Sequence, residues 1–235
     1  MSSKKSYWVV SGIYSIGSRL STLLFGFGSF YLLVRGLPQT EFGTWALFLT
    51  ITTIIEMSRN GLIQNALIKF LHSNPEDRHN QVVTASWILN LTYSVIIILM
   101  LLLLSVPLAG LFEVPEFSEM FMWYSVTLLA LVPFSQFNYI QQARFSFGGI
   151  FWSTLVRQGC FFLVILAHYL LSLQLSIIEL VVYQLVCTVA GLIMAFLCSR
   201  KYLTHRWSSR KQMVSRVFPF GKYVMGTNLL SLAYK

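Results

Sequence analysis

The chain has 235 residues, of which 56% are hydrophobic and 11% are charged, and its formal net charge is +9. A soluble domain has roughly 25% charged residues, and a soluble core of this length cannot bury so much apolar surface. Composition therefore excludes a soluble globular protein and predicts a polytopic membrane protein. In a membrane protein the net charge marks cytoplasmic loops, so we expect no nucleic acid partner.

Six continuous apolar runs predict an all-α transmembrane bundle. Each run has more than the ~20 residues that a helix needs to cross ~30 Å of hydrocarbon, and none alternates as the strands of a barrel do. The runs cover about residues 7–34, 42–70, 82–109, 121–143, 150–171 and 177–198, and a seventh begins at Val217.

The loops indicate the orientation and the domain boundaries. With a cytoplasmic N-terminus, the cytoplasmic segments hold eleven lysines and arginines and the external loops one, Arg35, which is a strong bias toward that topology. We expect a six-helix bundle over residues 1–199, a basic cytoplasmic linker over 200–216, and the start of a truncated second bundle over 217–235. Paired bundles are common in secondary transporters, so a C-terminal bundle of the same protein is an expected partner.

A charged segment interrupts the second run at residues 56–61, Glu-Met-Ser-Arg-Asn-Gly. Charges are costly in lipid, and a span that keeps them usually faces a protein interior or a water-filled cavity. Arg59 and Asn60 are three and four residues after Glu56, so all three share a helix face. Glu56 and Arg59 form either a self-neutralising ion pair or part of a polar site.

Three arginines lie at similar predicted depths, between the inner third and the middle of the membrane: Arg19 in the first run, Arg59 in the second and Arg157 in the fifth. Glu56 is the acid at that level, so the surplus is +2, or +1 if Arg157 extends to the cytoplasmic surface. An internal positive surplus suits an anionic ligand, and arginine binds phosphate bidentately. We expect a cationic central cavity.

Amides and small residues recur in the same layer, and each has two interpretations. Asn90 in the third run and Gln136 in the fourth either hydrogen-bond between helices or form, with Asn60, a polar vestibule for sugar hydroxyls. A stripe of small residues in the first run indicates either close helix packing or the wall of a water-filled cavity. Its members are Ser11, Ser15, Ser18, Thr22, Gly26 and Ser29.

The sequence shows no catalytic constellation. The four histidines do not gather around a nucleophile or show metal-ligand spacing, and there is no phosphate loop or dinucleotide motif. The three cysteines, Cys160, Cys187 and Cys198, lie in apolar runs and are interpreted as small buried hydrophobes. We expect a protein that is not an enzyme, with no metal and no cofactor.

The segment 33–45, Leu-Val-Arg-Gly-Leu-Pro-Gln-Thr-Glu-Phe-Gly-Thr-Trp, resembles the first external turn of bacterial lipid-linked oligosaccharide (O-antigen) flippases. These belong to the multidrug/oligosaccharidyl-lipid/polysaccharide exporter superfamily. Residues 60–70, the turn 141–145 and the opening of the seventh run at 220–235 are also similar to family features. The resemblance implies two six-helix bundles around a cavity that opens alternately to each side of the inner membrane.

The resemblance also implies that cavity arginines engage the pyrophosphate of a polyprenyl-linked glycan, a role that Arg19 and Arg59 fill by analogy. Many relatives have an acid just before the mid-span glycine of the second helix, where this chain has Arg59-Asn60. Glu56 is therefore the local candidate for ion coupling. Glycan polymerases are further partners that this role implies.

Taken together, these observations predict a flippase that moves a polyprenyl-pyrophosphate-linked oligosaccharide across the inner membrane for surface polysaccharide and O-antigen assembly. One alternative is a cation-coupled drug exporter of the same superfamily. Another is a membrane glycan polymerase or acyltransferase, and a third is a product that is inactive without its second bundle. The predicted substrate-binding residues are Arg19, Arg59, Arg157, Asn60, Asn90 and Gln136.

Overall fold

The structure is a computed structural model that describes residues 2–73 and 79–203, together with residues 219, 223, 224, 226, 227 and 230. Within the two continuous stretches the chain is helical and contains no strand. The helices are α1 Ser2–Gly36, α2 Gln39–Ser73, α3 His79–Leu111, α4 Glu116–Ala143, α5 Phe147–Leu170, α6 Ile177–Ser199 and the short 3-10 helix η2 Arg200–Tyr202. The all-α prediction is confirmed, and each of the first six apolar runs corresponds to one helix.

A tight turn at residues 36–38 joins α1 to α2. The Leu37 N–H donates to the Leu33 carbonyl at 3.0 Å, which continues the bonding pattern of α1. Pro38 has no N–H to leave unsatisfied, so it suits the point where a new helix begins. Its carbonyl accepts the first bond of α2, from the Phe42 N–H at 2.9 Å. The two helices therefore share one apex.

The C-termini of α3, α4 and α5 end with the same cap. A residue with a positive φ follows each helix, namely Glu113, Phe145 and Ser172. The next N–H then donates back over the turn to a carbonyl five residues earlier. This Schellman arrangement satisfies carbonyls that the helix itself leaves free, so the three turns are short and well defined although none uses glycine at the left-handed position.

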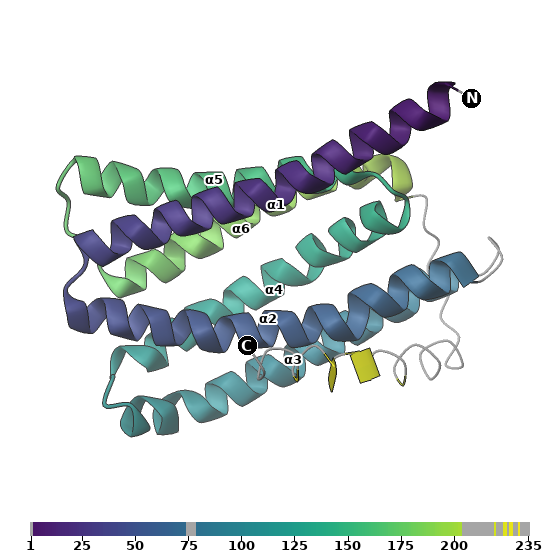
Figure 1. Ribbon diagram of the computed structural model, residues 1–235. Helices are drawn as coiled ribbons and strands as arrows, with labels where there is room; N and C mark the ends of the chain where they lie inside the picture. The colour runs from purple at the N-terminus through teal and green to yellow at the C-terminus, as the bar shows by residue number, and fades with distance from the viewer. Residues whose placement is uncertain are drawn as a thin grey trace.

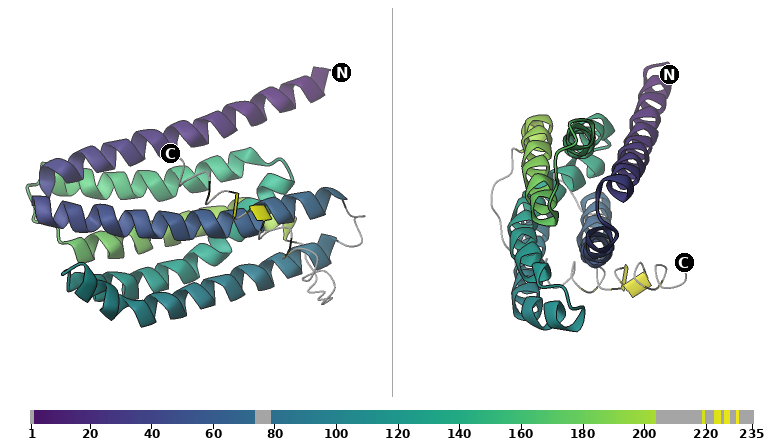
Figure 2. Two further views of the ribbon diagram at one scale, coloured as in Figure 1. Left: turned by 60° about the horizontal axis from the view of Figure 1, so that its bottom comes forward. Right: turned by 90° about the vertical axis from the view of Figure 1, so that its left-hand side faces the viewer.

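The helices run side by side in an elongated bundle (Figure 1). α1 packs along α5, α5 on α6, α6 on α4 and α4 on α3, while α2 packs against α3 and α4. α1 meets α2 near their shared turn and diverges from it toward the N-terminus, as both views in Figure 2 show. The result is a V between α1 and α2 that is open at the end away from the turn.

Glycine-to-aromatic packing holds α1 against α5. A Cβ atom added to Gly28 would lie 2.7 Å from the Phe162 ring, so the helices approach closely at this point, as small residues allow in membrane bundles. The predicted small-residue stripe lies at the edge of this interface. Ser29 is buried, whereas Thr22 and Gly26 are exposed in the described structure.

The buried apolar side chains form two clusters. The larger cluster is built around Phe48 of α2, whose ring lies 5.8 Å from Phe121 and 5.6 Å from Tyr124. The smaller cluster joins the other halves of α2, α3 and α4, and its α2 members begin at Leu62. The charged segment 56–61 therefore falls between the two clusters, where the apolar core is interrupted.

The helices have the length and composition of membrane spans. Five are long and apolar enough to cross a bilayer: residues 10–36, 79–111, 116–143, 147–170 and 177–202. α2 has 35 residues but falls outside this group, because its polar residues between 56 and 65 lower its mean hydropathy. Leu24 and Leu103 exemplify the large apolar side chains that α1 and α3 expose. Such faces suit lipid contact, and the chain is a helical membrane protein.

Several predicted features lie outside the described residues. These are the loop at 74–78, the basic linker beyond residue 203, and nearly all of the seventh apolar run. The described start of the linker forms η2, with Arg200 and Lys201 exposed.

Candidate functional site

A cavity of about 360 Å³ lies between α1, α2, α5 and α6. Its volume is within the range of about 300–1,000 Å³ that is typical of ligand sites. α2 runs along the cavity and presents Trp45, Leu49, Thr52, Glu56 and Asn60 to it. These residues recur every three or four positions, so they form one face of the helix about 22 Å long.

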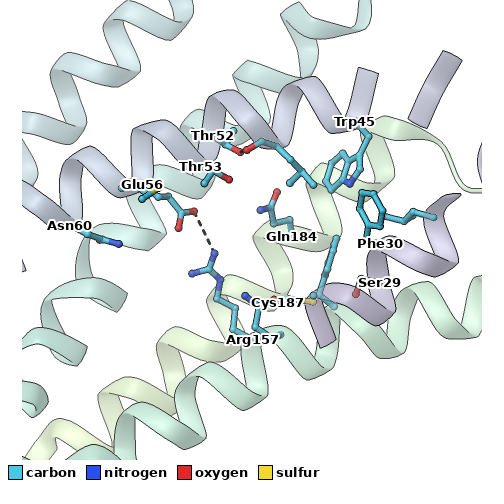
Figure 3. Close-up of a pocket in the computed structure, with 16 residues that line it drawn as sticks. Ser29, Phe30, Trp45, Thr52, Thr53, Glu56, Asn60, Arg157, Gln184 and Cys187 are labelled. Atoms are coloured by element: carbon cyan, nitrogen blue, oxygen red, sulfur yellow. Dashed lines mark hydrogen bonds and ion pairs between the residues drawn. The ribbon is translucent and has the colours of Figure 1, made fainter. Parts of the chain in front are cut away.

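The cavity has a charged end and an aromatic end (Figure 3). Glu56, Asn60 and Arg157 line the charged end, and Phe30 and Trp45 line the opposite end. The arrangement suits a ligand that combines an anionic group with an apolar or ring-shaped part.

The aromatic end is lined by ring contacts between α1, α2 and α5. Trp45 is 1% exposed and stacks on Phe161 of α5 at 6.3 Å between ring centroids. The ring centroids of Phe30 on α1 and Phe42 on α2 lie 5.3 Å apart. The α1 residues that line the cavity fall between Gly26 and Leu33, so α1 covers the aromatic end and not the charged one. We call the charged end, which no residue of α1 lines, the mouth of the cavity.

Glu56 and Arg157 form an ion pair across the cavity (Figure 3). Arg157 Nη2 lies 3.4 Å from Glu56 Oε1, and the side chains are 16% and 25% exposed respectively. The partner of Glu56 is thus on α5, 101 residues away, and not Arg59 on its own helix. Arg157 also does not extend to the surface, which was the alternative left open by its long side chain.

The Cβ end of the Arg157 side chain is fixed by its neighbours. A Cβ atom added to Gly191 of α6 would lie 2.8 Å from Arg157 Cβ, so α6 packs tightly against this part of α5. The guanidinium carbon lies 5.3 Å from the centre of the Phe134 ring, within the range of a cation–π contact. These contacts aim the guanidinium at the cavity.

Arg59 is buried outside the cavity. Its side chain is 2% exposed, and its Nε and Nη1 atoms have no hydrogen-bond partner in the described part of the chain. The hydroxyls of Tyr124 and Tyr139 on α4 lie within its electrostatic range. A buried guanidinium with free donors is costly, so the fold leaves the Arg59 charge only partly compensated.

Asn60 lines the cavity, and a hydrogen bond from α4 fixes its side chain. Asn60 Oδ1 accepts a hydrogen bond from the Tyr139 hydroxyl. One turn further along α2, Gln64 donates to Gln142 Oε1 at 2.6 Å. These two bonds connect α2 to α4 next to the charged end and keep the α2 face in register with the cavity.

Asn90 and Gln136 lie in the interface between α3 and α4, away from the cavity. Both side chains are 0% exposed. Asn90 Nδ2 donates to the Val132 carbonyl at 3.2 Å, and Gln136 donates to the Ser86 hydroxyl. This is the interhelical hydrogen bonding that the sequence left as one of two interpretations. Neither amide lies at the cavity surface.

We expect Asn90→Ala to weaken the bundle and to leave ligand binding unchanged. Interhelical hydrogen bonds in membrane proteins contribute about 0.6–1.7 kcal/mol, so the variant should unfold at a lower temperature in detergent by about that free energy. Asn60→Ala is the matched change inside the cavity, where binding should fall. Loss of binding by N90A at unchanged stability would contradict the placement of Asn90.

Arg19 is exposed on α1, before the first α1 residue that lines the cavity. The cavity thus brings together the side chains of Glu56, Asn60 and Arg157, whereas the side chains of Arg19 and Arg59 do not line it. The lining residues that were not singled out from the sequence include Thr52, Gln158 and Phe161. Thr52 lies four residues before Glu56, so extending the polar face of α2 outward would have found it.

The other side chains that could bind a metal or react are dispersed. In the described ranges, no three histidines, cysteines or acids lie close enough together to hold a metal ion. The three cysteines are unpaired; Cys187 is buried at the cavity wall, and Cys160 and Cys198 are half-buried.

Comparison with known proteins gives one match. The model of the family described as polysaccharide biosynthesis protein matches residues 9–235, a range that contains every residue of the cavity. No curated protein and no solved structure matches the chain. The family match confirms the resemblance drawn from the turn at 33–45.

Proposed function

The chain belongs to the polysaccharide biosynthesis protein family, and on that premise we propose that it moves a polyprenyl-pyrophosphate-linked oligosaccharide across the bacterial inner membrane for surface polysaccharide assembly. The observation that carries the proposal is Arg157, a guanidinium aimed into a cavity whose opposite end is aromatic. Arginine matches the geometry of phosphate oxygens.

The cavity is sized for part of such a substrate. Its volume of about 360 Å³ suits a phosphate and an adjoining sugar, while the rest of the glycan and the lipid extend through the mouth. Arg157 binds the phosphate, and Asn60 and Gln158 offer hydrogen bonds to sugar hydroxyls at the same end. Arg19, exposed on α1, is a further contact for anionic groups outside the cavity.

Topology gives the proposal its direction. With six spans and a cytoplasmic N-terminus, as the loop charges favour, the turn at residues 36–38 is external and the mouth of the cavity faces the cytoplasm. The arrangement then corresponds to an inward-open state. Alternating access requires a second bundle against which this one moves, and Glu56 at the mouth is the candidate for ion coupling.

Replacement of Arg157 tests the proposal. In a strain whose surface polysaccharide depends on this protein, Arg157→Gln should reduce glycan display by about tenfold or more, because a charge-assisted hydrogen bond to phosphate contributes about 1.5–3 kcal/mol. Arg35→Gln is the control, since Arg35 is exposed and lies over the Tyr31 ring away from the cavity. Normal display by R157Q would contradict the proposal.

A drug exporter is the second candidate, because an acid and aromatic rings line one cavity. Glu56 with Phe30 and Trp45 would suit a planar organic cation. The pair with Arg157 and the nearby Arg59 disfavour a cation at that acid. Increased drug sensitivity of a deletion strain with unchanged surface glycan would favour this function.

A further inference from the structure

The geometry of the Glu56–Arg157 ion pair at the mouth of the cavity leaves room for a ligand to compete with Glu56 for Arg157. A single contact of 3.4 Å joins Arg157 Nη2 to Glu56 Oε1, whereas an arginine and a carboxylate can form two parallel hydrogen bonds. Both side chains keep a part of their surface open to the cavity. Arg157 is anchored by Phe134 and Gly191, so of the two partners Glu56 has the less restricted head group.

A second guanidinium is within reach of the same carboxylate. Arg59 follows Glu56 by three residues on α2, and side chains at this spacing are neighbours on a helix. Its Nε and Nη1 atoms lack an acceptor among the described residues, and the side chain is 2% exposed. A buried donor without an acceptor destabilises the fold, and more so when it is charged. Arg59 would therefore gain from any acceptor that came within reach.

Tyr124 of α4 lies beside this part of α2. Its hydroxyl donates a long hydrogen bond of 3.5 Å to the Thr52 carbonyl, one turn before Glu56, and Glu56, Arg59 and Arg157 all act on it electrostatically. Glu56 is bonded to one guanidinium, that of Arg157, and a second, that of Arg59, lies three residues along its own helix.

We propose that Glu56 is a resident counter-ion that a phosphate displaces from Arg157 and that then pairs with Arg59. In the structure Glu56 is paired with Arg157. When a phosphate binds Arg157, the carboxylate turns to the buried guanidinium three residues along α2. Arg59 is then a positioning residue that acts through Glu56, and it favours binding without touching the ligand.

This inference rests on the proposed function for one element, the phosphate at Arg157. It adds a reason for the burial of Arg59, which a direct contact with substrate does not provide. The ligand chemistry is a pyrophosphate group, carried either by a prenyl lipid or by a free anion. Both sources would displace Glu56 in the same way, so the probes have to include both.

A double-mutant cycle on the 235-residue chain in lipid nanodiscs tests the exchange. Farnesyl pyrophosphate and inorganic pyrophosphate are the two probes, titrated into the unaltered chain, E56Q, R59M and the double variant. Arg59→Met should weaken binding about tenfold where Glu56 is present, because the displaced carboxylate then has no partner. In the E56Q background the same change should alter binding by less than about twofold, since the neutral glutamine has no carboxylate charge to transfer to Arg59.

The outcomes separate this inference from the proposed function. Equal weakening by R59M in both backgrounds overturns the exchange, because Arg59 would then act on the ligand or on the fold directly. Unchanged probe binding in R157Q instead overturns the phosphate site itself. Binding of farnesyl pyrophosphate without inorganic pyrophosphate identifies the lipid-linked form as the ligand and supports the exchange if the cycle is non-additive with that probe.

An infrared measurement on the unaltered chain covers the case in which a variant does not fold. Addition of pyrophosphate should give a carboxylate difference band that is absent in E56Q and that ends at the position of a guanidinium-paired carboxylate. A band that ends at the position of a water-solvated carboxylate, or no band, overturns the transfer to Arg59.

Discussion

Exchanging the two charges, with Glu56→Arg and Arg157→Glu in one chain, is expected to restore the stability of the bundle without restoring glycan display. Each single reversal places two like charges across the 3.4 Å contact. The loss should lie between the ~1 kcal/mol of an exposed pair and the ~3–5 kcal/mol of a broken buried pair, since both side chains are partly exposed. The double reversal restores the attraction.

Function should not return, because the phosphate would meet a carboxylate on α5 where it now meets a guanidinium. The new arginine on α2 would also lie one turn from Arg59, which would lose its neighbouring acid. Thermal unfolding in detergent measures the first effect, and surface glycan display in a dependent strain measures the second. Full recovery of display by the double reversal would mean that the pair only joins α2 to α5.

Arg59→Met is expected to make the bundle more stable and less active. Replacing buried charged groups by apolar residues of similar volume often stabilises a protein by about 1–4 kcal/mol, and Arg59 has two buried donors without acceptors in the described structure. Methionine is flexible enough to fill the space that the arginine stem occupies. A midpoint of thermal unfolding several degrees above that of the unaltered chain is the expected result.

Arg144→Met is the control for the change in net charge. Arg144 is exposed at the end of α4, and surface substitutions usually shift stability by less than about 0.5 kcal/mol. A lower unfolding midpoint for R59M would show that Arg59 has an acceptor, such as a bound water, in the folded protein. Higher stability with lower activity would be typical of a residue kept for function.

From the sequence an expected depth can be assigned to each polar residue, but not the direction in which its side chain points. Continuous apolar runs fix where a helix enters and leaves the membrane, and a rise of 1.5 Å per residue then gives the depth of Arg19, Arg59 and Arg157. Rotation about the helix axis is a different quantity. Helices that are apolar on every side carry little periodic signal to show which face turns inward. Three arginines at one level therefore ended in three different surroundings.

The partner of Glu56 shows the same limit. Spacing along α2 suggested Arg59, because residues three apart are neighbours on a helix. The structure pairs Glu56 with Arg157, which depends on how α5 packs beside α2 and is a property of the whole bundle. Asn90 and Gln136 are likewise buried polar residues, but their bonds across the α3–α4 interface could not be predicted from one helix at a time.

The shared apex of α1 and α2 makes the first helix a lever. α1 packs closely on α5 at Gly28, so a swing of α1 about the turn at residues 36–38 would carry the adjoining part of α5 with it. Arg157 lies level with a point of α1 about 22 Å from that turn, where a swing of about 5° would displace α5 by about 2 Å. The contact from Arg157 to Glu56 spans 3.4 Å, so a displacement of that size would break or compress it. The state of this ion pair would then depend on the angle between α1 and α2.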